Sequence, residues 1–138
     1  MESVDLACLT GPGKVRASGV HARVEVVNVW ASWCGPCRRE SRRLQAAHRH
    51  VASGVLFLGV DVKDSAARAR AFLAGRHLGY PQVSDPTGRF ARALHLFGVP
   101  STVVVDGTGR VRWRHDGELG AADVRQLLAR VRAAGGDG

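Results

Sequence analysis

The chain has 138 residues, 45% of them hydrophobic, and its 20 lysines and arginines against 12 acidic residues give a formal net charge of +8. This length suits one domain with a proper core, and the composition excludes a disordered chain or a small disulfide-stapled scaffold. The arginines are spread over several predicted helices without an aromatic-interleaved basic strip, which favours a solvated surface over a nucleic-acid site. The sequence contains no run of eighteen apolar residues, the length that could span a membrane.

The N-terminal region predicts a short hairpin, with residues 6–9 and 14–18 flanking a Gly-Pro-Gly turn. Cys8 lies in this hairpin and is interpreted as a small, partly buried apolar residue. The alternative, a third thiol that traps mixed disulfides, stays open. We expect a single domain over residues 1–138, with residues 1–5 and 134–138 as frayed termini.

The central feature is a Cys-x-x-Cys motif between a predicted strand, residues 24–30, and a predicted helix, residues 38–53. The spacing places the sulfurs of Cys34 and Cys37 on the first helical turn, within reach of a disulfide. The helix N-terminus favours a thiolate at Cys34, which is the reactive form of cysteine. A zinc site would need two further ligands, and Cys8 is the one other cysteine, so the motif predicts redox chemistry with no metal and no cofactor.

The helix after the motif has an amphipathic pattern. Its predicted inward stripe, at spacings of four and three, consists of Cys37, Ser41, Leu44, His48 and Val51. Cys34 falls off this stripe, so we expect an exposed attacking sulfur at Cys34 and a sheltered resolving sulfur at Cys37. His48 is expected at the edge of the core, and Gly54 is expected to end the helix.

Two further elements are predicted directly after this helix. The apolar run at residues 55–62 suits the middle of a sheet and completes a right-handed parallel β-α-β unit. Asp64 or Ser65 then caps a helix over residues 66–76. The inward face of that helix is predicted to carry Ala66, Ala69, Phe72 and Leu73.

The C-terminal part predicts a turn at residues 85–88, a short helix ending at Gly98, and a hairpin of residues 102–106 and 110–115. One face of the short helix is predicted to carry Phe90, Leu94 and Phe97. A final helix covers residues 121–133. It is predicted to bury Val124, Leu127, Leu128 and Val131.

The segment Val-Asn-Val-Trp-Ala-Ser-Trp-Cys-Gly-Pro-Cys-Arg-Arg-Glu, residues 27–40, resembles the thioredoxin superfamily. More narrowly it resembles the TlpA/ResA-like branch of extracytoplasmic thiol-disulfide oxidoreductases, which includes cytochrome c maturation reductases. The resemblance covers residues 6–131 and implies an α/β thioredoxin-like fold with a central mixed β-sheet flanked by helices. Pro100 lies 63 positions beyond Cys37, a longer span than in plain thioredoxins, which implies an inserted helix before the proline loop.

The resemblance also implies a set of site residues. Cys34 is the expected nucleophile and Cys37 the resolving cysteine, with a cis Val99–Pro100 peptide facing them. The expected substrate groove consists of Trp33, Gly35, Pro36, Val99 and Pro100. An extended substrate segment would pair with the backbone around Val99.

One acidic residue is a candidate proton acceptor for Cys37. Plain thioredoxins carry a buried aspartate six positions before the first cysteine, where this chain has Asn28, which cannot act as a base. Glu40 matches the glutamate that follows the motif in ResA-like proteins. A surface glutamate paired with Arg43 is the alternative. Arg42 stands where relatives carry a helix-bending proline.

The motif therefore predicts a thiol-disulfide oxidoreductase that exchanges with protein cysteines as a reductant, and the resemblance alone implies an extracytoplasmic compartment. The expected partners are protein thiols or disulfides, apocytochrome c among them, and a membrane redox partner; we expect a monomer that binds no nucleic acid. A cytosolic general thioredoxin, an oxidising DsbE-like donor and a non-enzymatic binding module are the alternatives. A peroxidase is disfavoured, because the attacking cysteine of peroxiredoxins normally follows a threonine two positions earlier, where this chain has Ser32.

Overall fold

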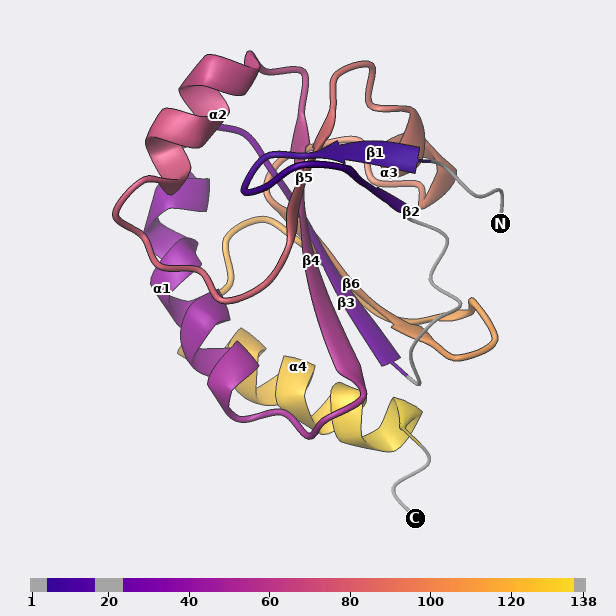
Figure 1. Cartoon of the computed structure of the whole chain (residues 1–138). Helices are drawn as coiled ribbons and strands as arrows, with labels where there is room; N and C mark the ends of the chain where they lie inside the picture. Colours follow the sequence, from indigo (N-terminus) through magenta and orange to yellow (C-terminus); the bar gives the residue numbers. More distant parts are fainter. Residues whose placement is uncertain (1–4, 17–23, 136–138) are drawn as a thin grey trace.

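A computed structural model describes residues 5–16 and 24–135, which form a central mixed sheet with helices on both faces (Figure 1). The sheet order is β2-β1-β5-β4-β3-β6-β7. The strands are β1 (Asp5–Cys8), β2 (Lys14–Arg16), β3 (Val24–Trp30), β4 (Val55–Val62), β5 (Gln82–Asp85), β6 (Ser101–Asp106) and β7 (Val111–Asp116). The helices are α1 (Gly35–Arg49), α2 (Ala66–Leu73), α3 (Arg89–Ala93) and α4 (Ala121–Ala134).

The centre of the sheet confirms the predicted β-α-β unit. β3 pairs in parallel with β4, and β4 pairs in parallel with β5. β6 lies antiparallel to β3 and continues into β7, while the N-terminal hairpin of β1 and β2 joins the other edge through an antiparallel pairing with β5. The predicted mixed sheet, N-terminal hairpin and inserted helix α2 are therefore all present.

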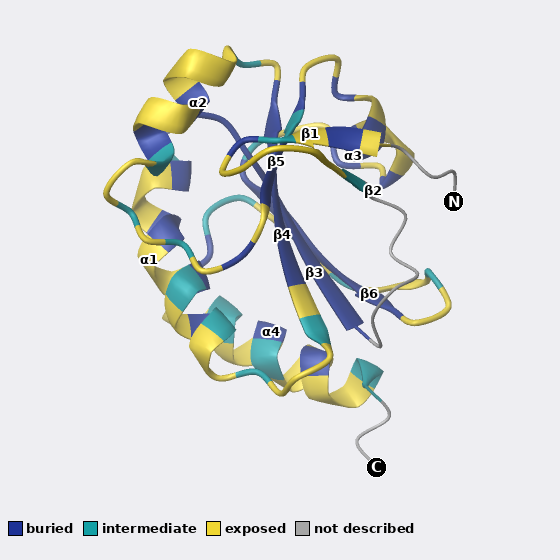
Figure 2. Cartoon of the chain, viewed as in Figure 1, coloured by how far each residue is buried: buried dark blue, intermediate teal, exposed yellow. Residues whose placement is uncertain are grey.

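Two cores cover the two faces of the sheet, and Figure 2 shows β3 buried along its length between them. Side chains alternate across a strand, so Val24 and Val26 of β3 point to the face covered by α1 and α4. Val27 and Val29 point to the opposite face, where they pack with Phe90 of α3. This double burial explains why β3 reads as an almost continuous apolar run.

Helix α1 differs from its prediction at its C-terminal end. It ends at Arg49, and Gly54 lies in the following turn with a φ of +94° rather than at the helix terminus. The N–H of His50 bonds to the carbonyl of Ala47, which closes the last turn. Val51 then leaves the helix and packs against the α1/α4 core. His48 is half-buried, as expected for a residue at the edge of the core.

Helix α2 is also shorter than predicted. It ends at Leu73 because Ala74 is extended and Gly75 takes a positive φ of +81°, so the chain cannot continue the helix to residue 76. Ala69 and Phe72 form its buried face, Leu73 is half-buried, and Ala66 is exposed, contrary to prediction.

Two corrections concern the segment before the proline loop. Helix α3 ends at Ala93, and His95 adopts a φ of +58°, which changes the direction of the chain. Leu96 is consequently buried, whereas Phe97, predicted to face the core, is 75% exposed. Strand β5 was not predicted, because its four residues lie between two prolines and show no clear alternation.

The C-terminal elements follow the prediction closely. The hairpin of β6 and β7 is present, and α4 buries Leu127 and Val131, with Val124 and Leu128 only half-buried. The termini predicted to be frayed lie largely outside the described residues. Within that prediction, Asp5 already belongs to β1 and Ala134 still belongs to α4.

Candidate active site

The two cysteines of the motif form a disulfide at the N-terminus of α1. Cys34 is the N-cap residue, and Pro36 occupies the first turn, where its missing N–H is not needed. The Sγ atoms lie 2.19 Å apart and the Cα atoms 5.3 Å apart. The Cys34 Sγ also accepts a hydrogen bond from the backbone N–H of Cys37 at 3.2 Å. A thiolate at Cys34 would be stabilised by the same N–H group and by the helix dipole.

Both sulfurs are sheltered in this disulfide form. The exposed fraction is 5% for Cys34 and 2% for Cys37, so the prediction of an exposed Cys34 is wrong for the oxidised protein. The reason is a small apolar cluster that encloses the pair and includes Leu9, Trp30 and Phe72. The two cysteines therefore differ less in burial than in position, because Cys34 is the N-cap of the helix and Cys37 lies in its first turn.

The proline loop lies beside the cysteine pair. The Val99–Pro100 peptide is cis, as predicted, and Val99 packs against the cluster that holds both cysteines. Val99 and Trp33 also line a groove of about 180 Å³, and Trp33 is 59% exposed. The Trp33 indole donates a hydrogen bond to the carbonyl of Lys63 at 3.2 Å, which fixes the ring.

The remaining predicted groove residues, Gly35, Pro36 and Pro100, do not line this groove. Gly35 is exposed and Pro36 is half-buried at the start of α1. Pro100 is buried and lines a second hollow of about 330 Å³, together with Phe97 and Val99. The structure thus brings Trp33 and Val99 together around one groove.

Glu40 is buried under the motif, with 1% of its surface exposed. Its Oε1 accepts a hydrogen bond from Asn28 Nδ2 at 2.8 Å, and its Oε2 accepts one from the backbone N–H of Leu119 at 2.9 Å. Burial raises the pKa of Glu40 to about 7, although these two hydrogen bonds offset part of that rise. The alternative of a surface glutamate paired with Arg43 is wrong, because Arg43 contacts Glu118 instead.

Asn28 connects Glu40 to the cysteine pair. Its side chain also donates to Thr102 Oγ1 at 3.1 Å, so its amide orientation is fixed by two acceptors on different elements. Asn28 and Cys37 line the same small cavity, whose volume of about 10 Å³ is close to that of one water molecule. The resemblance placed a carboxylate of plain thioredoxins at the position of Asn28 on the strand, and the buried carboxylate found here is Glu40 of α1.

Asp61 is a buried acid that the sequence analysis missed. It has 1% of its surface exposed, and no described residue donates a hydrogen bond to its carboxylate oxygens, but in its protonated form it shares a side-chain hydrogen bond with Asp64. Its Cα pairs in register with that of Trp30, which belongs to the cysteine cluster. Burial first, and the neighbouring Asp64 second, raise the pKa of Asp61 to about 9. The available signal was an acidic residue inside an otherwise apolar strand.

Asp64 holds the loop that leads into the motif. Its carboxylate accepts hydrogen bonds from the backbone N–H of Ser32 at 2.7 Å and from the Ser32 hydroxyl at 2.9 Å. It also accepts one from the N–H of Ser65, whose own hydroxyl caps α2 through the N–H of Arg68. Asp64 therefore ties the residue two positions before Cys34 to the start of α2. Of the two predicted caps, Asp64 or Ser65, Ser65 is the one that caps α2.

The described residues offer neither a metal-binding cluster nor a membrane-spanning helix. Within residues 5–16 and 24–135, His, Cys, Asp and Glu side chains do not form a group of three or more that could hold a metal ion. Over the same part of the chain, the helices are too short or too polar to cross a membrane.

A Cys-x-x-Cys disulfide at the N-terminus of the first helix of a thioredoxin-like sheet defines a protein of the thiol-disulfide oxidoreductase class. The chain belongs to the AhpC/TSA family, whose pattern it matches over residues 3–114. These two findings agree with the resemblance of residues 27–40 to the thioredoxin superfamily.

Relatives place the chain more narrowly. It is 37% identical to the thiol:disulfide interchange protein DsbE homolog of Paracoccus denitrificans over 80% of this chain and 62% of that protein. It is 38% identical to the thiol:disulfide interchange protein HelX of Rhodobacter capsulatus over 70% of this chain and 54% of that protein. The chain thus spans a little over half the length of these relatives. The predicted TlpA/ResA-like branch is confirmed.

Solved structures show the same similarity. The structure of a secreted thiol-disulfide isomerase from Corynebacterium glutamicum superimposes with a TM-score of 0.77 at 31% identity, over 95% of this chain and 84% of that one. The predicted thioredoxin-like fold is confirmed by this agreement.

Proposed function

We propose that this protein exchanges its Cys34–Cys37 disulfide or dithiol with cysteines of protein substrates, as a reductant outside the cytoplasm. The single observation that carries the proposal is the Cys34–Cys37 disulfide at the N-terminus of α1, with Val99 of the proline loop packed against it. A helix N-terminus favours the thiolate that disulfide exchange requires. The neighbouring groove offers a backbone edge to an extended substrate.

The reaction consists of two sulfur displacements. The Cys34 thiolate attacks one sulfur of a substrate disulfide, which forms a mixed disulfide and releases the other substrate sulfur as a thiolate. The Cys37 thiolate then attacks the Cys34 sulfur, which forms the observed bond and releases the second substrate thiolate. The substrate gains two electrons and two protons, and the protein loses both.

Cys37 must lose its proton before the second displacement. Glu40 is suited to receive it, since its pKa of about 7 lets it exchange protons near neutral pH. Glu40 follows Cys37 by three positions on α1, and it accepts a hydrogen bond from Asn28, which lines the small cavity beside Cys37. We assign Glu40 the role of proton acceptor in the resolving step.

The direction of exchange depends on how strongly the reduced form is favoured. Gly35 and Pro36 between the cysteines add no charge to stabilise the thiolate, which supports a reductant. Arg38 and Arg39 act in the opposite sense, but exposed charges are screened within about 10 Å at ordinary salt. We therefore favour reduction, with an oxidising DsbE-like donor as the alternative.

Substrates and compartment are part of the same proposal. The names of the relatives support protein thiols or disulfides as substrates, and a secreted neighbour supports an extracytoplasmic location. Apocytochrome c as substrate, a membrane protein as electron donor and a monomeric state follow from the resemblance to the TlpA/ResA-like branch. A cytosolic general thioredoxin is the alternative.

The decisive experiment equilibrates the protein with glutathione redox buffers and measures the fraction of Cys34–Cys37 disulfide by alkylation. A midpoint near the roughly −270 mV of thioredoxin supports a reductant, and one near the roughly −120 mV of DsbA overturns it. An insulin-reduction assay tests the exchange activity itself. Consumption of peroxide at a higher rate than insulin reduction would instead favour a peroxidase.

A further inference from the structure

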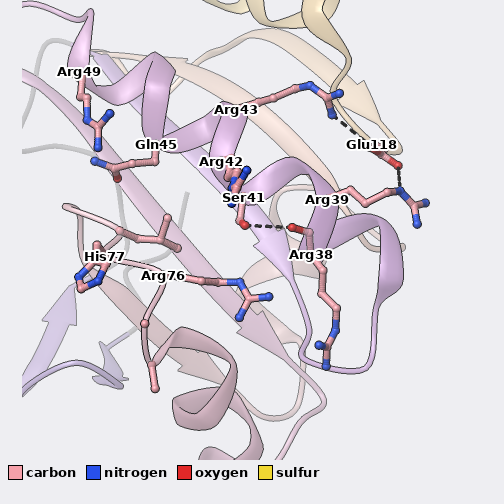
Figure 3. A pocket seen from close by; sticks show the side chains of 13 residues that line it. Arg38, Arg39, Ser41, Arg42, Arg43, Gln45, Arg49, Arg76, His77 and Glu118 are labelled. Carbon is pink, nitrogen blue, oxygen red and sulfur yellow. Dashed lines mark hydrogen bonds and ion pairs between the residues drawn. The ribbon is translucent and has the colours of Figure 1, made fainter.

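A groove of about 960 Å³ follows the outer side of α1 and faces the loop after α2, residues 74–78 (Figure 3). The groove, here called the arginine groove, is lined by Arg38, Arg39, Arg42, Arg43, Arg49 and Arg76. Of the described residues that line it, Glu118 alone is acidic. The lining of the groove therefore carries six guanidinium groups and one carboxylate. This excess of positive charge is proportionally larger than in the chain as a whole.

The arginines differ in how far they are already engaged. Arg39 and Arg43 share Glu118, at 2.9 Å and 3.4 Å. Arg42 and Arg49 form no ion pair or side-chain hydrogen bond with any residue that the structure describes. Two cations of the groove thus remain available for a ligand.

Two further arginines approach each other across the groove. The guanidinium of Arg38 lies 5.5 Å from the centre of the Phe72 ring, and that of Arg76 lies 4.0 Å from it. Burial first, and the charge of Arg38 second, lower the pKa of Arg76. Like charges so arranged repel each other, and an anion placed between them removes that repulsion.

The position of the groove links it to the redox pair. Arg38 directly follows Cys37, and its guanidinium donates a hydrogen bond back to the carbonyl of Ser32 at 3.1 Å. Neither Trp33 nor Val99 lines the arginine groove, so it flanks the cysteines on a side separate from the proline loop. A protein joined to Cys34 would place its neighbouring residues within reach of both surfaces.

We propose that the arginine groove binds an acidic segment of the protein that exchanges disulfides with Cys34. The proposal rests on the proposed function and specifies, in addition, that the partner protein carries negative charge near its exchanging cysteine. From Arg38 to Arg49 the helix rises about 17 Å, which is the length of about five extended residues. A polypeptide is favoured over a nucleic acid, because Phe72, the ring beside the groove, is buried, stacks on Trp30 at 4.8 Å and offers no free face for base stacking.

The test compares two peptides with the same disulfide and a flank of five residues, either Asp/Glu or Asn/Gln. The reduced protein should reduce the acidic peptide about tenfold faster at low salt, and added salt should remove the preference. The double variant Arg42→Gln/Arg49→Gln should lower the preference to about twofold. The matched control, Arg125→Gln/Arg132→Gln, removes two exposed arginines seven positions apart on α4 and should keep the full preference.

Hydroxyethyl disulfide, a small neutral substrate, separates failure of the groove from failure of the proposed function. No reduction of it by the native protein would refute the exchange activity itself. Normal reduction together with equal rates for the two peptides would overturn the groove alone. Titrations with a single-stranded oligonucleotide and with phosphatidylglycerol vesicles complete the test. Tighter binding of either one than of the acidic peptide, lost in Arg42→Gln/Arg49→Gln, would also overturn the assignment to a polypeptide.

Discussion

Replacing Asp61 by asparagine should stabilise the protein at neutral pH. Asp61 lies buried beside Trp30, where no described residue donates a hydrogen bond to its carboxylate, and burial first and Asp64 second raise its pKa to about 9 from an ordinary value of 3.8. The folded protein therefore holds a proton that the unfolded chain releases. This proton stabilises the fold fully below the unfolded pKa, and the stabilisation is lost as the pH rises toward the folded pKa.

The magnitude follows from the distance between the working pH and the unfolded pKa. At pH 7 Asp61 lowers the free energy of unfolding by about 3 to 4 kcal/mol relative to a neutral side chain in the same place. Asparagine has the same shape and cannot ionise. Asp61→Asn should accordingly be about 2 to 4 kcal/mol more stable than the native protein at pH 7, which corresponds to a rise of about 10 °C in Tm.

Urea unfolding of the oxidised protein, followed by circular dichroism between about pH 4 and pH 8, measures this difference. The gain from Asp61→Asn should vanish near pH 4 and grow by at most about 1.4 kcal/mol per pH unit. Asp116→Asn is the control, because Asp116 is an exposed carboxylate and its removal should change stability by less than about 0.5 kcal/mol. A difference that does not vary with pH, or a loss of stability at pH 7, would refute the reasoning.

The remaining predictions concern the chemistry of the site. Cys34→Ser should abolish exchange, whereas Cys37→Ser should accumulate a mixed disulfide that is visible on a non-reducing gel; preferential alkylation of Cys37 in the native reduced protein would reverse these roles. Glu40→Gln should slow the resolving step and remove a rise in its rate near pH 7, measured by stopped-flow decay of the mixed disulfide. Gln45→Glu, on the same helix, is the control for a general effect of substitution on α1. An unchanged pH profile in Glu40→Gln would exclude Glu40 as the proton acceptor.

Local patterns were sufficient for the parts of the fold that depend on neighbouring residues. The β-branched run of β3 and the position of the cysteines at a helix terminus are properties of contiguous sequence. The prediction for β3 was correct to the residue, whereas α1 begins at Gly35, before the predicted start at Arg38. The ends of α1 and α3 were predicted too far along the chain. Those ends depend on tertiary packing, since Val51 and Leu96 leave their helices in order to be buried.

The burial of the two acids depends on distant parts of the chain and could not be derived from local patterns. Glu40 is covered by Leu119, which lies 79 positions away, and by Asn28. Asp61 lies in an apolar strand, where the pattern indicates that it is buried but does not show that Asp64 is its neighbour. Family resemblance pointed to Glu40, and no sequence signal distinguished its buried state from a surface ion pair with Arg43.

The short segment before α4 joins the buried carboxylate to the arginine groove. The backbone N–H of Leu119 holds Glu40, and the side chain of the preceding Glu118 holds Arg39 and Arg43. The negative charge of Glu118 also adds to the raised pKa of Glu40, while His115 acts in the opposite sense. Because these contacts lie on consecutive residues, the protonation of Glu40 and the charge at one end of the groove act on each other electrostatically.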